Sequence, residues 1–326
     1  MPCQKISIIS FDHWDYDRHI SAMLESKGIV ATHIKIGSFK HANFWVQIKN
    51  TFSKVFLNHN PKEIRRQQFI IEQLNEIGFQ DQILVINPEL IFKEFHLEIK
   101  KHTKKYIAYL YDSVSRNPIT HLLDGVFDEI YSFDKTDIAK YGFKETTNYN
   151  YITTKPVVRQ FENVPDVIYI ASFDERMTYL ANFASYLRKR NYTFNFIISG
   201  KKATLFYFKK RFSGQFDPVI FRRRKINQNE LLELYAQSKV ILDLTRDNQV
   251  GLSFRAFEAM GLEKKLITDN VVIKEYAFYN PNNICVIDRN NVIIPSSFLE
   301  SAYEKVPDAI YHEYTLAHWV DKIFNL

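Results

Sequence analysis

The chain has 326 residues, of which 46% are hydrophobic and 25% are charged, and its formal net charge of +6 corresponds to a pI near 9.0. This length accommodates two ordinary domains, and the composition is typical of a globular protein rather than a disordered one. The sequence contains no run of about 18 apolar residues, which argues against a membrane-spanning helix.

The N-terminus and the cysteines bear on the compartment of the protein. The stretch MPCQKISIISFDHWD reaches charged residues too early for a secretory signal, and Cys3 and Cys285 have no metal or redox spacing. We therefore expect a reducing, cytoplasmic setting. The excess positive charge predicts an anionic partner, for which a phosphorylated substrate, a membrane surface and a nucleic acid are the three open classes.

Short apolar runs alternate with helical patterns through the first half of the chain. Five runs are predicted as strands: 5–11, 32–37, 82–87, 105–112 and 127–133. Open parallel sheets bind ligands in the loops that follow their strands. Asp12 and His13 follow the first of these strands and Asp112 ends the fourth, so their side chains are candidates to face a ligand. The alternative for each is a helix cap or an ordinary loop residue.

Two other features of the first half have an ordinary structural interpretation. The only Asp-x-Asp motif, Asp15-Tyr16-Asp17, opens the first helix instead of ending a central strand, so we interpret it as helix N-terminal charge and expect no metal. Residues 40–66 are rich in aromatic and basic side chains at helical spacing. We expect the apolar face of this segment to pack on the sheet. The alternative is a helix that lies on anionic lipid.

A second series of apolar runs predicts a second parallel sheet, with strands at 166–172, 194–200, 239–244, 264–270 and 283–288. The polar, proline-bearing stretch 151–165 separates the two series and marks a domain boundary. The fold class is therefore α/β with two domains, and the carboxyl ends of their strands are expected to define a cleft. The basic run Phe221–Lys225 is interpreted as a solvated edge, with a phosphate contact as the alternative.

The stretch 244–270, LTRDNQVGLSFRAFEAMGLEKKLITDN, combines a glycine loop with the start of a helix. Gly251 allows a backbone to approach a ligand, and Ser253 is a good N-cap for a helix that begins at Phe254. The amides at such a helix start bind phosphate. Arg255 suits phosphates and Glu258 suits the two hydroxyls of a ribose, whereas the alternative is a surface i,i+3 ion pair.

The segment 227–270 resembles the donor-binding region of GT-B glycosyltransferases, most closely those of bacterial lipopolysaccharide and capsule biosynthesis. The residues that carry the resemblance are Leu234-Tyr235 with Ser238, the strand 240–244, Gly251-Leu252 with Arg255, and Glu258-Ala259-Met260. Weaker likenesses occur at 109–117, 127–143 and 169–180. The resemblance implies two Rossmann-like domains facing each other across a cleft. The first domain would span residues 1–155 on the acceptor side, and the second would span 156–308 and bind the nucleotide sugar.

The same resemblance implies roles for particular residues. The nucleotide sugar would contact Gly251, Leu252, Ser253, Arg255 and Glu258, together with Arg176 and Arg246 at the phosphates. One departure concerns the E-x7-E pattern of many retaining members, because its first glutamate falls on Val250. The sequence therefore leaves retention or inversion of the anomeric configuration open. The final helix, 309–326, would cross back to the first domain and bury Trp319 and Phe324 there.

The sequence thus predicts a metal-independent, cytoplasmic glycosyltransferase that uses a nucleotide sugar and a cell-surface glycan or glycolipid acceptor, without any cofactor. An inverting enzyme would need Asp12, His13 or Asp112 as its base, whereas a retaining one needs none. The first alternative is a sugar-nucleotide epimerase of the same fold. The second is a noncatalytic carbohydrate- or nucleic-acid-binding protein, although no recognised nucleic-acid motif occurs and we expect no nucleic-acid partner.

Overall fold

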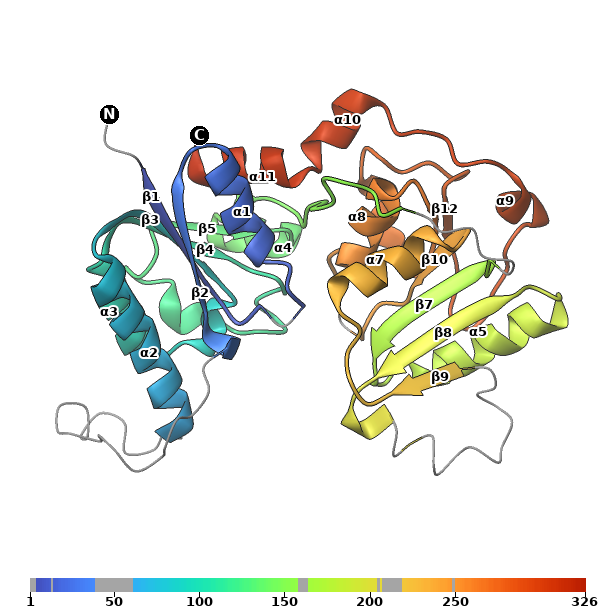
Figure 1. The fold of residues 1–326 in the computed structure, drawn as a ribbon, viewed down its shortest axis with the longest axis horizontal. Coiled ribbons are helices and arrows are strands. Elements are labelled where there is room, and N and C mark those ends of the chain that lie inside the picture. The colour runs from blue at the N-terminus through green and yellow to red at the C-terminus, as the bar shows by residue number, and fades with distance from the viewer. Residues whose placement is uncertain are drawn as a thin grey trace. The chain divides into compact units, whose positions relative to one another are not determined.

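The computed structural model describes residues 4–12, 14–38, 61–157, 164–203, 206, 219–247 and 250–326 (Figure 1). The chain divides into two compact units, which are described separately. Unit 1 comprises Met1–Thr146 and Trp319–Leu326, and unit 2 comprises Thr147–His318. His13 and most of the predicted helix at 40–66 lie outside the described residues.

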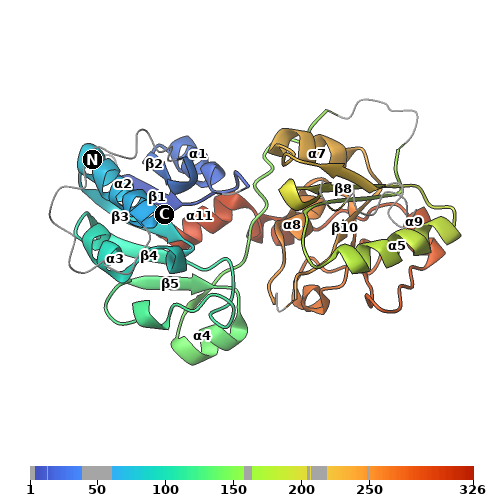
Figure 2. The same ribbon diagram turned by 90° about the horizontal axis from the view of Figure 1, so that it is seen from below.

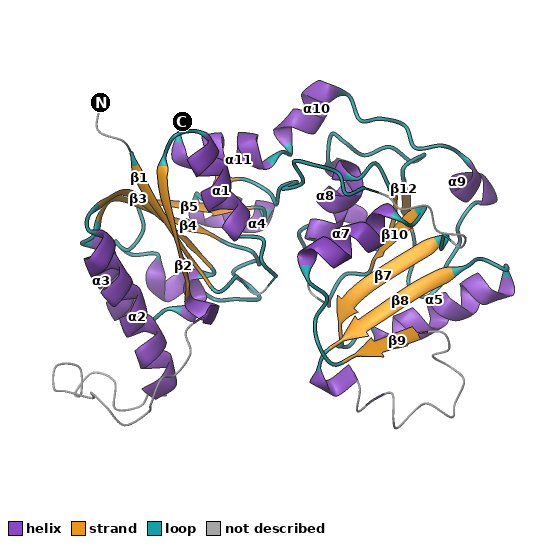
Figure 3. Ribbon diagram, in the orientation of Figure 1, coloured by secondary structure: helices purple, strands orange, loops and turns teal. Residues whose placement is uncertain are grey.

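Unit 1 contains a parallel sheet with the strand order β2-β1-β3-β4-β5-β6 (Figure 3). The strands are β1 Lys5–Ser10, β2 Val30–Lys35, β3 Gln80–Ile86, β4 Thr103–Tyr109, β5 Glu129–Ser132 and β6 Lys144–Glu145. Its helices are α1 Arg18–Ser26, α2 Pro61–Ile77, α3 Lys93–Lys100 and α4 Lys135–Tyr141, with short 3-10 turns η1 Ile36–Ser38, η2 Pro88–Leu90 and η3 Thr120–Leu122. All five predicted strands are confirmed. The sixth was missed because its two residues are polar and exposed.

Successive residues of β3 point to opposite faces of this sheet, as in any strand. On one face, Ile83 and Val85 pack in a core with side chains of α2 and α3. On the other face, the amide of Gln82 donates a hydrogen bond of 2.9 Å to the backbone oxygen of Phe324, in α11 Leu316–Phe324. Trp319 of the same helix meets the ring of Tyr109 edge-on at 5.2 Å. The terminal helix therefore supplies part of the packing of unit 1.

Unit 2 contains a second parallel sheet, with the order β12-β11-β10-β7-β8-β9. Its strands are β7 Val167–Ser172, β8 Phe194–Ser199, β9 Val219–Arg222, β10 Val240–Asp243, β11 Lys265–Thr268 and β12 Ile284–Val286. Counted from β7, this is the 3-2-1-4-5-6 order of the Rossmann fold. The five predicted strands are again confirmed. The sixth, β9, lies at the sheet edge and includes the beginning of the basic run Phe221–Lys225.

Helices cover both faces of the second sheet, and Figure 2 shows α5 Met177–Lys189 and α7 Gln228–Ala236 on opposite sides. Alternate residues of β7 contribute to two separate cores. Tyr169 packs with α5 and α9 Ser296–Glu300, whereas Ile168 and Ile170 pack with α7 and α8 Phe254–Gly261. The remaining elements are η4 Val271–Glu275 and α10 Asp308–Glu313.

The stretch that begins unit 2 is held tightly against it. Asn150 exchanges backbone hydrogen bonds with Tyr314 and Leu316, and its amide donates to the hydroxyl of Tyr311 at 2.7 Å. A Cβ atom at Gly261 would lie only 2.5 Å from the side chain of Asn150. Glycine at this position therefore allows residues 150 and 151 to pass directly over the end of α8.

Candidate functional site

The order of the second sheet reverses between β7 and β10, which are hydrogen-bonded neighbours. In open α/β sheets a ligand binds at such a switch point, outside the carboxyl ends of the strands. The chain leaves β7 into Phe173–Arg176 and leaves β10 into Leu244–Asp247. A ligand of unit 2 is therefore expected to bind at these two loops.

Two of the predicted arginines meet at Asp174 in this place. Arg176 donates to both carboxylate oxygens of Asp174, at 2.8 and 2.5 Å, and to the backbone oxygen of Leu244 at 2.8 Å. Arg246 donates to Asp174 from the other loop, at 3.2 Å. Burial alone would raise the pKa of Asp174, but the hydrogen bonds and charges of the two arginines hold this pKa below its usual value. The side chain of Arg176 is buried, whereas that of Arg246 is 40% exposed.

Arg255, the third predicted arginine, reaches back from α8 to the sheet. It donates to the carboxylate of Asp243 at 2.9 Å and twice to the backbone oxygen of Ile170, at 3.2 and 2.8 Å. Its guanidinium also lies 5.4 Å from the centre of the Tyr169 ring. The hydrogen bonds to a carboxylate and a carbonyl and the contact with a ring face together restrict the motion of the planar guanidinium. Arg255 thus joins α8 to the carboxyl half of β7 and the end of β10.

Glu258 is buried, with 1% of its surface exposed. One of its carboxylate oxygens accepts a hydrogen bond of 2.6 Å from the hydroxyl of Tyr151. The alternative interpretation of Arg255 and Glu258 as a surface ion pair is therefore wrong. A ribose hydroxyl that binds this oxygen must share it with Tyr151 or displace the tyrosine.

The glycine loop before α8 is anchored through its backbone. The carbonyl of Gly251 accepts from the amide of Asn270 at 3.1 Å, and the carbonyl of Leu252 accepts from Asn148 at 2.9 Å. The hydroxyl of Ser253 accepts from the backbone N–H of Arg255, which confirms the predicted N-cap. Val250, at the position of the missing glutamate, is 44% exposed.

The basic run begins in β9, the edge strand, which β8 separates from β7. Arg222 pairs with Glu230 at 2.6 Å, and both side chains are substantially exposed. Arg223 and Arg224 are exposed as well. The interpretation of this run as a solvated sheet edge is confirmed.

Unit 1 has a second group of charged side chains, at the carboxyl ends of β1 and β2. Asp12 is buried, has a left-handed φ of 42°, and accepts from the backbone N–H of Asp17 at 3.0 Å. The ammonium of Lys35 lies 3.3 Å from Asp12 and 2.5 Å from the exposed Asp15. A non-glycine residue in this conformation is strained, and such strain is found most often at functional sites.

Asp17 was interpreted as helix N-terminal charge, and this interpretation is wrong for its side chain. Asp17 occupies the N-cap position of α1 but makes no capping bond there. Its buried carboxylate instead accepts a short hydrogen bond from the hydroxyl of Tyr111, which follows β4. Burial, reinforced by the nearby Asp12, raises the pKa of Asp17 to about 7. Among the described residues, no group of three or more histidine, cysteine or acidic side chains is arranged to hold a metal.

β4 ends at Tyr109, so Asp112 does not end the strand as expected but lies in the loop after it. It is half-buried there, and the amide of Asn117 donates to it at 3.5 Å. The same amide donates to Glu89 at 3.1 Å, and Asn87 donates to the same oxygen of Glu89 at 3.0 Å. Burial raises the pKa of Glu89. Of the three predicted acceptor-side residues, Asp112 is thus reachable by solvent, Asp12 is buried, and His13 lies outside the described residues.

Comparison with known proteins bears on this arrangement. Residues 178–305 match the family model described as "Glycosyl transferase-like". The structure resembles sucrose-phosphate synthase from Thermosynechococcus elongatus, at a TM-score of 0.66 and 11% identity, over 99% of this chain and 98% of that one. The chain has the GT-B fold. No curated protein sequence matches it.

Other solved structures share this GT-B fold. A glycosyltransferase from Rickettsia africae is 13% identical, with a TM-score of 0.59, over 100% of this chain and 98% of that one. The UDP-GlcNAc 2-epimerase of Methanocaldococcus jannaschii, solved with UDP-GlcNAc and UDP, is 14% identical, with a TM-score of 0.58, over 99% of both chains. Structural similarity at identities this low establishes the fold of the chain. Its reaction has to be argued from its own residues.

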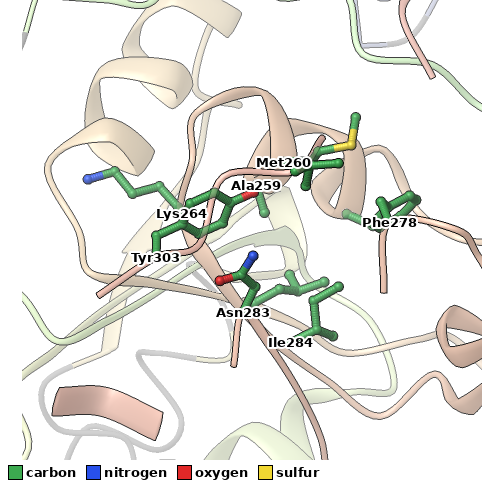
Figure 4. A pocket seen from close by; sticks show the side chains of 10 residues that line it. Ala259, Met260, Lys264, Phe278, Asn283, Ile284 and Tyr303 are labelled. Atoms are coloured by element: carbon green, nitrogen blue, oxygen red, sulfur yellow. The ribbon is translucent and has the colours of Figure 1, made fainter. Parts of the chain in front are cut away.

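One cavity of the GT-B chain is unrelated to the switch point. It lies beside α8 and is lined by Ala259, Met260, Lys264, Phe278 and Tyr303, among others (Figure 4). Its volume of about 10 Å³ accommodates about one water molecule. The amide of Asn283, which also lines it, donates to the backbone oxygen of Glu304 at 2.6 Å. The cavity is too small for a nucleotide.

Proposed function

We propose that this GT-B protein is a glycosyltransferase that moves a sugar from a nucleotide-sugar donor to a cell-surface glycan or glycolipid. The observation that carries the proposal is the placement of Arg246. Its partly exposed guanidinium lies at the switch point of a Rossmann sheet, within the segment that matches a glycosyl transferase-like family. A fixed cation at this position suits the diphosphate of a nucleotide sugar.

The leaving nucleotide carries negative charge that the enzyme has to stabilise. Preorganised cations and helix amides stabilise such charge without a metal ion. In this proposal Arg246 contacts the diphosphate directly, and the amides at the start of α8 assist it. Arg176 and Arg255 fix the surrounding segments, since each donates to one backbone carbonyl and one carboxylate. No resident metal or other cofactor is part of the proposal.

Glu258 is proposed to accept from the donor ribose, with Tyr151 sharing its carboxylate or leaving it. Loss of this charged acceptor should weaken nucleotide binding by about 1.5 to 3 kcal/mol. Glu258→Gln tests the role with little change of shape, because a glutamine oxygen can still accept from Tyr151. Equal nucleotide affinities of the wild type and this variant, measured by calorimetry, would remove Glu258 from the site.

On the acceptor side, Asp112 is the proposed base if the reaction inverts the anomeric configuration. It lies at the carboxyl edge of the first sheet and is accessible to solvent. A buried Asp12 would reach an acceptor only after a local rearrangement. If the reaction retains the configuration, Asp112→Asn should leave turnover nearly unchanged.

A matched pair of variants tests the proposed donor site. Thermal shift is measured with UDP, GDP, CDP and ADP, because a ligand that binds only the folded state raises the melting temperature. One of these nucleotides should stabilise the wild type, and Arg246→Ala should lose most of that shift. Arg222→Ala is the control, because Arg222 is an exposed arginine that pairs with Glu230 at the edge strand of the sheet and not at the switch point. Equal shifts in all three proteins would refute the role of Arg246.

The epimerase of the same fold remains the second candidate, because the structure resembles UDP-GlcNAc 2-epimerase over its full length. An epimerase needs only its sugar nucleotide, whereas a transferase also needs a glycan acceptor. Incubation with each sugar nucleotide, with and without glycan acceptors, separates the two. Conversion of the donor to a 2-epimer in the absence of acceptor would favour the epimerase.

The proposed compartment is the cytoplasm, and peripheral contact with the inner face of the cytoplasmic membrane is a separate hypothesis. Among the described residues, no helix is both long and apolar enough to cross a membrane. Peripheral contact with anionic lipid would depend on the basic aromatic segment 40–66, most of which lies outside the described residues. Sedimentation with vesicles containing phosphatidylglycerol, compared with vesicles of phosphatidylcholine alone, tests this contact.

A further inference from the structure

We propose that Asp269 and Arg289 are positioning residues for the donor diphosphate, because together they clamp the backbone that presents Arg246. This inference rests on the proposed function and deepens it. Neither residue stands out in the sequence, since Asp269 follows β11 and Arg289 follows β12, outside the stretch between Arg246 and Glu258. The fold brings both to the loop that leaves β10.

The clamp closes around Thr245, the residue before Arg246. One carboxylate oxygen of Asp269 accepts from the backbone N–H of Thr245 at 2.8 Å and from its hydroxyl at 2.9 Å. Arg289 donates to the backbone oxygen of Thr245 at 2.6 Å and also contacts its hydroxyl. Both backbone polar groups and the side chain of Thr245 are therefore held by two charged groups.

The two clamping residues are themselves fixed. Arg289 donates to the second oxygen of Asp269 at 2.5 Å and to Asp247 at 3.1 Å. Its guanidinium lies 4.7 Å from the centre of the Tyr179 ring on α5. The Asp269 side chain is only 2% exposed and that of Arg289 is 19% exposed. A buried ion pair with this many hydrogen bonds has little freedom to move.

The result is a short loop that is held on both sides of Arg246. Leu244 is bonded to Arg176, Thr245 to Asp269 and Arg289, and Asp247 to Arg289. Only Arg246 within this run extends a substantially exposed cation from the loop. Recognition of a diphosphate by one arginine depends on its placement to within about 1 Å. The clamp supplies this placement through the backbone, without contacting the ligand.

Lysine at position 289 would keep the positive charge but lose the planar fork that reaches three partners at once. Arg289→Lys and Asp269→Asn should therefore each weaken binding of the nucleoside diphosphate at least about tenfold. Binding of the matching nucleoside, which has no phosphate, should stay within about twofold. Thr245→Val removes only the central hydroxyl and should give a smaller loss of the same kind.

Lys265 provides the structural control, because it begins β11, the strand whose other end leads to Asp269. Its ammonium donates to the backbone oxygen of Phe298 and to the hydroxyl of Ser301. Lys265→Met should lower the melting temperature and leave both affinities unchanged. The affinities are measured by calorimetry with UDP, GDP, CDP and ADP and with their nucleosides, on full-length proteins.

Each outcome of the test discriminates. If the wild type binds a nucleoside diphosphate and the clamp variants bind it equally well, the clamp serves stability only and this inference is wrong. If the variants lower the affinity for the nucleoside and for the diphosphate by the same factor, the clamp shapes the whole pocket and not the phosphate contact. This result also overturns the inference. If the wild type binds none of the nucleotides, the proposed function fails and the inference fails with it.

Discussion

Replacement of Asp17 by asparagine should change how the stability of the protein depends on pH. The carboxyl group of Asp17 is buried, and the ionised form is disfavoured by burial and by Asp12, although Tyr111, Ser10 and Lys35 partly offset this. The pKa of Asp17 is about 7 in the folded protein, against an ordinary value of 3.8. The folded state therefore keeps a proton that the unfolded state releases.

The direction of the effect follows from this difference. The stabilisation by the retained proton is complete below about pH 4 and is lost as the pH rises through 7. Between pH 5 and pH 8 the wild type should lose on the order of 2 to 3 kcal/mol of unfolding free energy through this group. An asparagine side chain cannot titrate in this range, and its oxygen can still accept from Tyr111. The unfolding free energy of Asp17→Asn, measured relative to that of the wild type, should thus be higher at pH 8 than at pH 5 by this amount.

Urea denaturation of both proteins at pH 5, 6, 7 and 8 measures the difference. Asp124→Asn is the control, because Asp124 is an exposed aspartate of the same unit. The control should follow the pH dependence of the wild type. If Asp17→Asn also runs parallel to the wild type from pH 5 to pH 8, the carboxyl group is ionised in the folded protein and the reasoning is refuted.

Three further predictions concern other parts of the molecule. His96 is buried between the hydroxyl of Tyr106 and the backbone oxygen of Pro88, and burial lowers its pKa to about 4. The stabilisation by neutral His96 should be complete above about pH 6.5, and up to about 3 kcal/mol of unfolding free energy should be lost as the pH falls toward 4. In His96→Gln the urea midpoint should therefore depend less on pH over this range. Phe324→Ala removes an almost fully buried ring and should cost about 3 to 5 kcal/mol, whereas truncation after Pro307 should abolish activity and cooperative melting together; an unchanged melting temperature would contradict both. Transferase activity should survive EDTA, and loss of turnover that magnesium or manganese restores would show that a metal takes part.

Most of the predicted strands could be found because they contain apolar runs that are buried on both faces of the sheet. Two of the four edge strands, β6 and β9, gave no such signal. In β9 the apolar residues Val219 and Phe221 alternate with Ile220 and Arg222, both of which are exposed. The strand β6 has only two polar residues. Sequence patterns therefore revealed all the inner strands and the edge strands β2 and β12, and missed the other two edge strands.

Prediction of local structure around the candidate site succeeded where the signal is local. Ser253 and the helix after it follow from neighbouring residues, and Arg246 follows a recognisable strand. The partners of these residues could not be foreseen, because hydrogen bonding between distant segments depends on strand order and register. Tyr111 is 94 residues from Asp17, and Arg289 is 44 residues from Thr245. Arg255 was assigned to the same helix side as Glu258, but its long side chain turns to Asp243 instead.

The membership of the last helix in unit 1 has a consequence for synthesis on the ribosome. Trp319–Leu326 complete a unit whose other residues are made first, and the whole of Thr147–His318 is translated in between. At about 5 to 20 residues per second, this interval lasts on the order of ten to thirty seconds. During that time the face of the first sheet that carries Gln82 and Tyr109 lacks its covering helix. The nascent chain therefore exposes this face to chaperones until α11 has been made, so closure of the first-made unit has to wait for the synthesis of unit 2.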